Sequence, residues 1–239
     1  IKTVRYDILG DPAAAMMAFE AGSFDYFPTL AEVDVDRIIA SGEWNVVEYE
    51  ASFARSVYMN LTNGIFDNVQ VRQALAYATN KENMVALIQN GKGNVADSFF
   101  HPEMMVNTSA PDTILSYDLE KAKELLAEAG YPNGEGIPTL KLVTMETHKD
   151  YALAIQQDYA ELGITVEILF LDANTFMADM VTGNYDLAVN ICNLGNMVYP
   201  WGRIFESQYL GQTNFGLIDD EKIDELFSTT SVNTVSVPS

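Results

Sequence analysis

LKLVTMETHKDYALAIQQDYAELGITVEILFLDANTFMADMVTGNYDLAVNI, residues 140–191, carries the clearest structural pattern in the chain. Short runs of branched and apolar residues alternate there with longer amphipathic stretches. The runs are typical of buried strands, and the stretches have the length and spacing of helices. The pattern predicts strands at 140–145, 164–171 and 185–191, with helices at 149–162 and 173–182. Such strict alternation indicates crossover helices and a largely parallel sheet, so we expect an α/β protein.

The regions on either side mix the two kinds of element less regularly. Further strands are predicted at 1–8, 24–27, 45–50 and 54–61, and further helices at 12–21, 33–40, 68–89, 118–130 and 219–227. The helical region 68–89 is interrupted at 79–82, where Thr79 or Asn80 can cap a second helix. Either Ser116 or Asp118 can cap the helix that follows the long loop at 91–116. The whole is expected to form a mixed, twisted sheet flanked by helices.

Composition excludes several classes of function. The 239 residues contain 34 acidic and 13 basic side chains, a net charge of −21. This excess disfavours nucleic acid and anionic membranes as partners, because both are bound through clustered Lys and Arg. The apolar fraction of 48% argues against disorder. A lone Cys192 excludes an internal disulfide and leaves the compartment undecided.

Catalytic and metal-binding motifs are absent from the sequence. His101, His148 and Cys192 are its only His and Cys residues, and no two of them have ligand spacing. We expect exposed or hydrogen-bonded histidines and a buried thiol that packs as a small apolar side chain. GxSxG, CxxC and HExxH are all missing. The sequence therefore predicts no metal, no cofactor and no catalytic residue.

A polar and aromatic cluster follows the last of the alternating strands. Amides and aromatic rings together are the combination that a small-molecule site uses, and open α/β sheets bind ligands in loops at the carboxyl ends of strands. Asx turns with surface-packed aromatics are an equally good interpretation of the residue types. Phe27 and Pro28, after the predicted strand 24–27, are weaker candidates for the wall of a cleft. The candidate cluster is Asn190, Asn193, Asn196, Tyr199 and Trp201.

Several sequence segments, taken in order, resemble one family of proteins. They are AFEAGSFDYF (18–27), YMNLTNGIFDNVQVRQALAYATNKENM (58–84), YDLEKAKELLAEAGYPNG (117–134), DYAELGITVEI (158–168) and MVTGNYDLAV (180–189). The chain is similar, over about residues 10–227, to bacterial extracytoplasmic solute-binding proteins of peptide-type ABC importers. These include oligopeptide and dipeptide binders and their nickel- and oligosaccharide-binding relatives.

The resemblance implies a type II periplasmic-binding-protein-like lobe. It places residues 1–227 in the second, C-terminal ligand-binding lobe and leaves 228–239 as a truncated or irregular tail. The first lobe of the same protein and the ABC permease subunits are the implied partners, along with a small-molecule solute, peptide or oligosaccharide. The implied location is extracytoplasmic, in the periplasm or as a cell-surface lipoprotein. The implied activity is capture and delivery of a solute, not catalysis.

Two charged anchors that peptide binders of this family commonly use are missing. Val189 stands where an Arg is expected, and Gly195 or Asn196 stands near an expected Asp. Because a charge-assisted hydrogen bond contributes about 1.5–3 kcal/mol, their loss favours a neutral, hydroxyl-rich solute or a peptide held by its backbone. An oligosaccharide stacked on Tyr199 and Trp201 is one such option. Arg72, in the family's VRQAL pattern, is expected to brace a loop or form an ion pair.

Two other classes of function remain open on the sequence. A non-catalytic protein-docking domain would use the acidic surface, and a hydrolase domain could share the same alternation of strand and helix. A large apolar patch away from residues 190–201 would favour docking. A titratable residue near those positions with a strongly shifted pKa would favour catalysis.

Overall fold

The computed structural model describes residues 2–7, 9, 11–28, 30, 32–48, 53–96, 115–193 and 199–233. The chain divides into two compact units, residues 1–50 and 51–239. The single lobe at 1–227 stays a prediction, and each unit is described by itself below.

The first unit is built on two short helices. Helix α1 (Pro12–Glu20) begins after Asp11, whose Oδ1 accepts a hydrogen bond from the Ala14 amide at 2.8 Å. Helix α2 (Glu32–Ser41) carries Arg37, which is ion-paired with Glu20 of α1 and Asp34 of α2. A small apolar cluster contains the buried residues Met16, Phe19 and Ile38, with Phe24, Phe27, Leu30, Trp44 and Val46 packed against it.

The strands predicted in the first unit are wrong wherever the structure describes them. Residues 2–7, 24–27 and 45–48 are irregular, although both helices lie where the sequence predicts them. Alternating residues favour an extended chain, but a strand also needs a partner for its backbone N–H and C=O groups. No such pairing occurs among the described residues of this unit.

The second unit contains a four-stranded mixed sheet. Its strands have the order β1-β4-β2-β3, with β2 parallel to β3 and β4, and β1 antiparallel to β4. The three parallel strands are those predicted from residues 140–191, and the mixed α/β fold is confirmed. The strands are β1 (Phe53–Met59), β2 (Leu140–Thr144), β3 (Val166–Phe170) and β4 (Leu187–Asn193).

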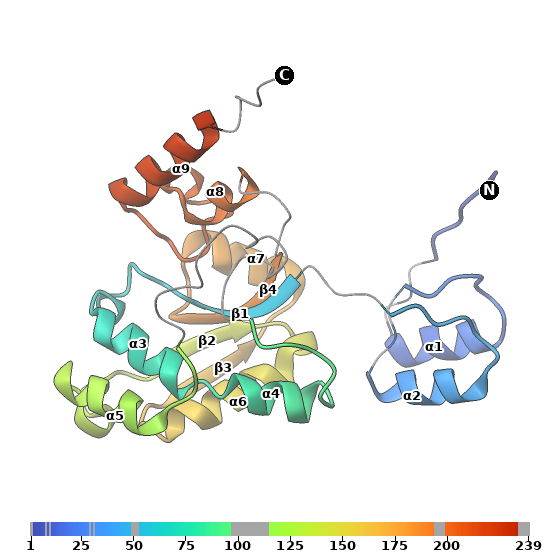
Figure 1. Ribbon diagram of the computed structural model, residues 1–239, viewed down its shortest axis with the longest axis horizontal. Helices are drawn as coiled ribbons and strands as arrows, with labels where there is room; N and C mark the ends of the chain where they lie inside the picture. The colour runs from blue at the N-terminus through green and yellow to red at the C-terminus, as the bar shows by residue number, and fades with distance from the viewer. Residues whose placement is uncertain are drawn as a thin grey trace. The chain divides into compact units, whose positions relative to one another are not determined.

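Helices cover both faces of this sheet (Figure 1). On one side lie α3 (Val69–Ala78), α4 (Lys81–Ile88), α5 (Leu119–Glu128) and α6 (Lys149–Ala160), and on the other α7 (Ala173–Thr182), α8 (Tyr199–Phe205) and α9 (Glu221–Asn233). Short 3₁₀ turns occupy Gly64–Phe66, Pro132–Gly134, Glu146–His148 and Ser207–Tyr209. Helix α8 is absent from the sequence prediction, and α9 continues past the predicted end at residue 227.

The core follows the alternation of side chains along the strands. Leu187 and Val189 of β4 belong to the cluster that packs on α3, α5 and α6, while Ala188 belongs to the cluster with Phe176 and Met180 of α7. Successive residues of a strand point to opposite faces, so a single strand supplies both cores.

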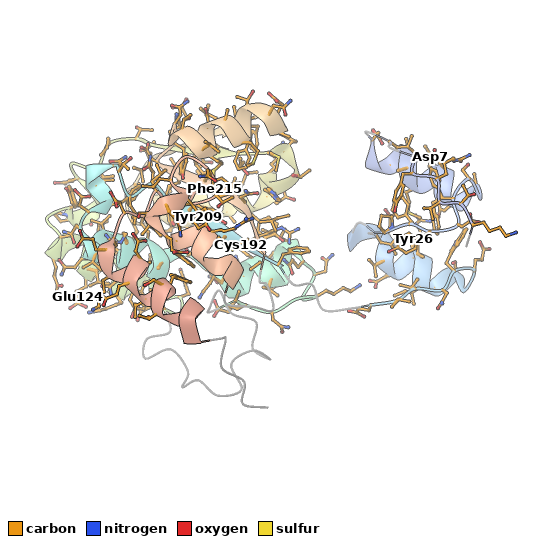
Figure 2. All side chains as sticks on the ribbon, turned by 90° about the horizontal axis from the view of Figure 1, so that it is seen from above. Asp7, Tyr26, Glu124, Cys192, Tyr209 and Phe215 are labelled. Atoms are coloured by element: carbon orange, nitrogen blue, oxygen red, sulfur yellow. The ribbon has the colours of Figure 1, made fainter. Side chains whose placement is uncertain are left out.

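Side-chain hydrogen bonds fix the helix ends and loops of the second unit. Asn80 and Asp118, each one of two alternatives in the sequence, cap α4 and α5 by accepting from the amides of Asn83 and Lys121. Arg72 braces a loop through the Phe66 and Asp67 carbonyls, as predicted. Acidic residues on α5 lie on its exposed side, and Glu124 is at the rim of the unit in Figure 2.

Candidate functional site

The candidate site lies at the carboxyl ends of the parallel strands, where open α/β sheets bind ligands. Strand β2 ends at Thr144, in line with Phe170 at the end of β3. Strand β4 continues to Asn193 and stays paired with β1 as far as Phe53. Because Val143 is in register with Ala188, the β1–β4 ribbon projects several residues beyond the ends of β2 and β3.

One face of the projecting ribbon points toward α8 and α9. Asn190 is half-buried there opposite Ser56, and Cys192 lies opposite Ala54. The Cys192 side chain is buried against Ile204, Phe205 and Phe227. Burial raises the pKa of its thiol, which keeps it protonated and a poor nucleophile. The prediction of a buried thiol that packs as a small apolar side chain is confirmed.

The predicted residues of the 190s are only partly described. Asn190 is described in full. The backbone of Asn193 belongs to β4 and that of Tyr199 and Trp201 to α8, but the side chains of these three residues lie outside the described part. Asn196 lies outside the described residues altogether. Tyr199 and Trp201 therefore begin a helix, not the loop that the sequence suggested. Their contacts with a ligand stay predictions.

Phe27 and Pro28 belong to the first unit. Phe27 is half-buried, and its ring lies 5.3 Å from that of Phe19, centroid to centroid. Pro28 is exposed. Phe27 thus helps to form the small core of that unit, and its place in a cleft stays a prediction.

The opposite face of the ribbon carries a group of residues that the sequence analysis missed. The Arg55 guanidinium lies over the ring of Tyr151, 4.6 Å from its centroid, and 5.9 Å from that of Phe53. The Tyr151 hydroxyl accepts a hydrogen bond from Gln89 Nε2 at 2.9 Å. Arg55, Gln89, His148 and Tyr151 are called the Arg55 cluster below.

His148 of this cluster differs from the expectation for a histidine. Its side chain is 4% exposed, and neither Nδ1 nor Nε2 has a hydrogen-bond partner among the described residues. Burial, with a smaller contribution from the positive charge of Arg55, lowers the pKa of His148 below 6.5. The expectation of an exposed or hydrogen-bonded ring is therefore wrong at His148, while His101 lies outside the described residues. A buried polar ring without a partner is uncommon and calls for a reason.

The sequence held one signal for this cluster. His148 and Tyr151 lie three residues apart at the start of a predicted helix that directly follows a predicted strand, so they share one side of that helix. Arg55 could not be added without knowing that β1 pairs with β4, which is distant in sequence.

The described residues show neither a metal-binding group nor a membrane-spanning helix. No three His, Cys, Asp or Glu residues gather closely enough among them to hold a metal ion. None of their helices is both long enough and apolar enough to cross a bilayer. What the described edge of the sheet offers is hydrogen-bonding groups, aromatic rings and one exposed guanidinium, which suit binding.

The fold is that of a lobe of a type II periplasmic binding protein. With about 93% of this chain aligned, the oligopeptide-binding protein AppA of Bacillus subtilis, solved in complex with a nonapeptide, superposes with a TM-score of 0.79 at 22% identity, over 47% of its own length. HbpA2 from Haemophilus parasuis superposes with a TM-score of 0.73 at 26% identity, covering 94% of this chain and 45% of that one.

The sequence comparisons identify the family. Residues 1–214 match the family described as bacterial extracellular solute-binding proteins, family 5 Middle, and the chain belongs to this family. It is 32% identical to the heme-binding protein A of Haemophilus influenzae over 233 residues, 92% of this chain and 41% of that protein. It is 27% identical to AppA of Bacillus subtilis over 84% of this chain and 39% of that protein. The chain thus spans about two fifths of the length of these relatives.

Proposed function

We propose that this chain is a ligand-binding part of the substrate-binding component of an ABC importer. It captures a peptide-like or oligosaccharide solute outside the membrane and delivers it to the permease, without making or breaking a bond. The observation that carries the proposal is the family match over residues 1–214. The carboxyl ends of the parallel strands supply the polar and aromatic groups that such a site needs.

The partners follow from the same proposal. The solute would be enclosed between residues of this chain and a first lobe of the same protein, and the complex would dock on the permease subunits. Residues 1–227 then act as the second lobe, with 228–239 as its tail, in the periplasm or at the cell surface. Asn190, Asn193, Asn196, Tyr199 and Trp201 are the proposed contacts on the α8 side, with Phe27 and Pro28 as further candidates.

Binding of peptides and oligosaccharides by the protein, expressed with whatever flanking sequence its gene encodes, tests this function. Trp201→Ala should weaken binding by about tenfold or more, because a ring that covers the solute is lost. Residues 1–239 contain tryptophan only at positions 44 and 201, so a fluorescence change on binding that is kept in Trp44→Phe and lost in Trp201→Phe reports on Trp201. Isothermal titration calorimetry gives the affinities.

Three results would contradict the proposal in different ways. Unchanged affinity in Trp201→Ala would remove that residue from the site. Turnover of any solute would replace binding with catalysis. Nanomolar binding by residues 1–239 alone would show that the first lobe is not needed, whereas we expect weak binding because that lobe would supply about half of the enclosing surface.

A further inference from the structure

The Arg55 cluster contains more hydrogen-bond donors than acceptors. A guanidinium has five N–H groups, and a neutral imidazole has one. The Tyr151 hydroxyl accepts from Gln89 and so keeps its own hydrogen free to donate. Within the described part of the chain, none of the Arg55, His148 and Tyr151 donors has an acceptor.

This surplus stands out because the chain is strongly acidic. Several cations elsewhere in the described residues lie against carboxylates, as in the pairs Lys149–Glu146, Lys121–Glu124, Lys123–Glu120 and Arg37–Asp34. Others, such as Arg72 and Lys141, donate to carbonyl or amide oxygens of the chain. Arg55 has no such ion pair among the described residues, although the chain carries 34 acidic side chains. A guanidinium left without a carboxylate in these surroundings is suited to an anion from outside the chain.

Two aromatic rings lie beside the Arg55 guanidinium. Its Cζ lies 4.6 Å from the Tyr151 ring centroid and 5.9 Å from that of Phe53, while the side chain of Arg55 stays exposed at the edge where the parallel strands end. Stacking on a ring leaves the N–H groups at the rim of the guanidinium available for a bidentate contact. The side-chain entropy lost on binding is smaller for a group that is already held in place.

We propose that the Arg55 cluster binds a carboxylate of the solute. The inference rests on the proposed function and narrows its solute class to a peptide, or another carboxylic acid, in preference to an uncharged oligosaccharide. Arg55 on β1 then supplies a positive anchor on the neighbouring strand of the same ribbon, directly beside β4, where Val189 replaces the expected Arg. His148, buried in the same cluster, makes no hydrogen bond to this anchor.

The test compares peptides that differ only at the carboxylate. A set of tripeptides with free C-terminal carboxylates, the same set as C-terminal amides, and uncharged malto-oligosaccharides are titrated calorimetrically into the protein with its native flanking sequence. The free acids should bind at least about tenfold more tightly than the amides, as a charge-assisted hydrogen bond implies. In Arg55→Gln the ratio of the two affinities should fall to about one.

Lys123→Gln serves as the matched control, because it removes one positive charge from the outer side of α5. It should leave the acid-to-amide ratio unchanged. A ratio that survives in Arg55→Gln, equal affinity for acids and amides, or binding of oligosaccharides without peptides would overturn the assignment of Arg55 and leave solute binding intact. Absence of binding by all three sets would instead contradict the proposed function itself.

Discussion

The two units of the chain bury their apolar side chains to very different extents. In residues 1–50 the described apolar side chains include Tyr6, 88% exposed, and Tyr26, 75% exposed, both outside the small cluster around Phe19. Residues 51–239 enclose a sheet between two apolar clusters in which Leu142, Val143 and many others are inaccessible to solvent. Since burial of apolar surface is the main force that offsets chain entropy, we expect the second unit to be the more stable of the two by itself.

What separates the units is sheet formation. The second unit satisfies its extended backbone through three strand pairings, whereas the described extended segments of the first unit pair with none. A sheet gathers side chains that are far apart in sequence onto one surface, and helices can then cover that surface. Two short helices without a sheet provide a much smaller core.

Phe176→Ala and Phe19→Ala should have the largest effects and should act on different units. Phe176 is fully buried between α7 and the sheet, so its loss should cost the second unit about 3–5 kcal/mol of unfolding free energy. Phe19→Ala should instead disturb the first unit, where the centroids of the Phe19 and Trp44 rings lie 4.2 Å apart. Urea unfolding of Trp44→Phe and Trp201→Phe backgrounds reports on the second and the first unit respectively. Equal losses in both signals would mean that the units unfold together.

The sequence predicted the second unit far better than the first. All five elements of residues 140–191 are confirmed because their alternation is local and strongly periodic. The strand at 54–61 is confirmed as β1, yet equally strand-like runs at 1–8 and 45–50 fail in their described parts for want of a partner. Local pattern favours an extended chain but does not supply the neighbouring strand.

Prediction of the candidate site from sequence is limited by the same dependence on strand pairing. Placement of polar residues at the carboxyl end of a strand is predictable from the strand alone, as for Asn190. The Arg55 cluster depends on pairing between β1 and β4, which joins Arg55 to Ile191 across a long stretch of chain. Helix α8 was missed because Pro200 and Gly202 within it have low helix propensity and the segment is short.

Aspartate caps offer a smaller, matched test of the comparison. Asp11 caps α1 in the first unit and Asp118 caps α5 in the second, each with an Oδ1 that accepts from an amide, of Ala14 and Lys121 respectively. Asp118→Ala should cost the second unit about 1 kcal/mol, and Asp11→Ala should weaken the first unit alone. Ser116→Ala, the alternative cap in the sequence, should change stability by less than about 0.5 kcal/mol. A larger loss in Ser116→Ala than in Asp118→Ala would contradict the observed cap.

Lowering the pH should destabilise the second unit through His148, and this is the smallest of the expected changes in stability. Because the pKa of His148 is lowered in the folded chain, the unfolded chain binds more protons, and stability falls as the pH drops below about 6.5. His148→Gln should therefore lose less stability than the wild type between about pH 8 and about pH 5.5, whatever its starting value. Residues 1–50 contain no histidine, so the Trp44 signal should lack this component. An identical pH dependence in the wild type and His148→Gln would show that the folded chain does not hold this ring in its neutral form.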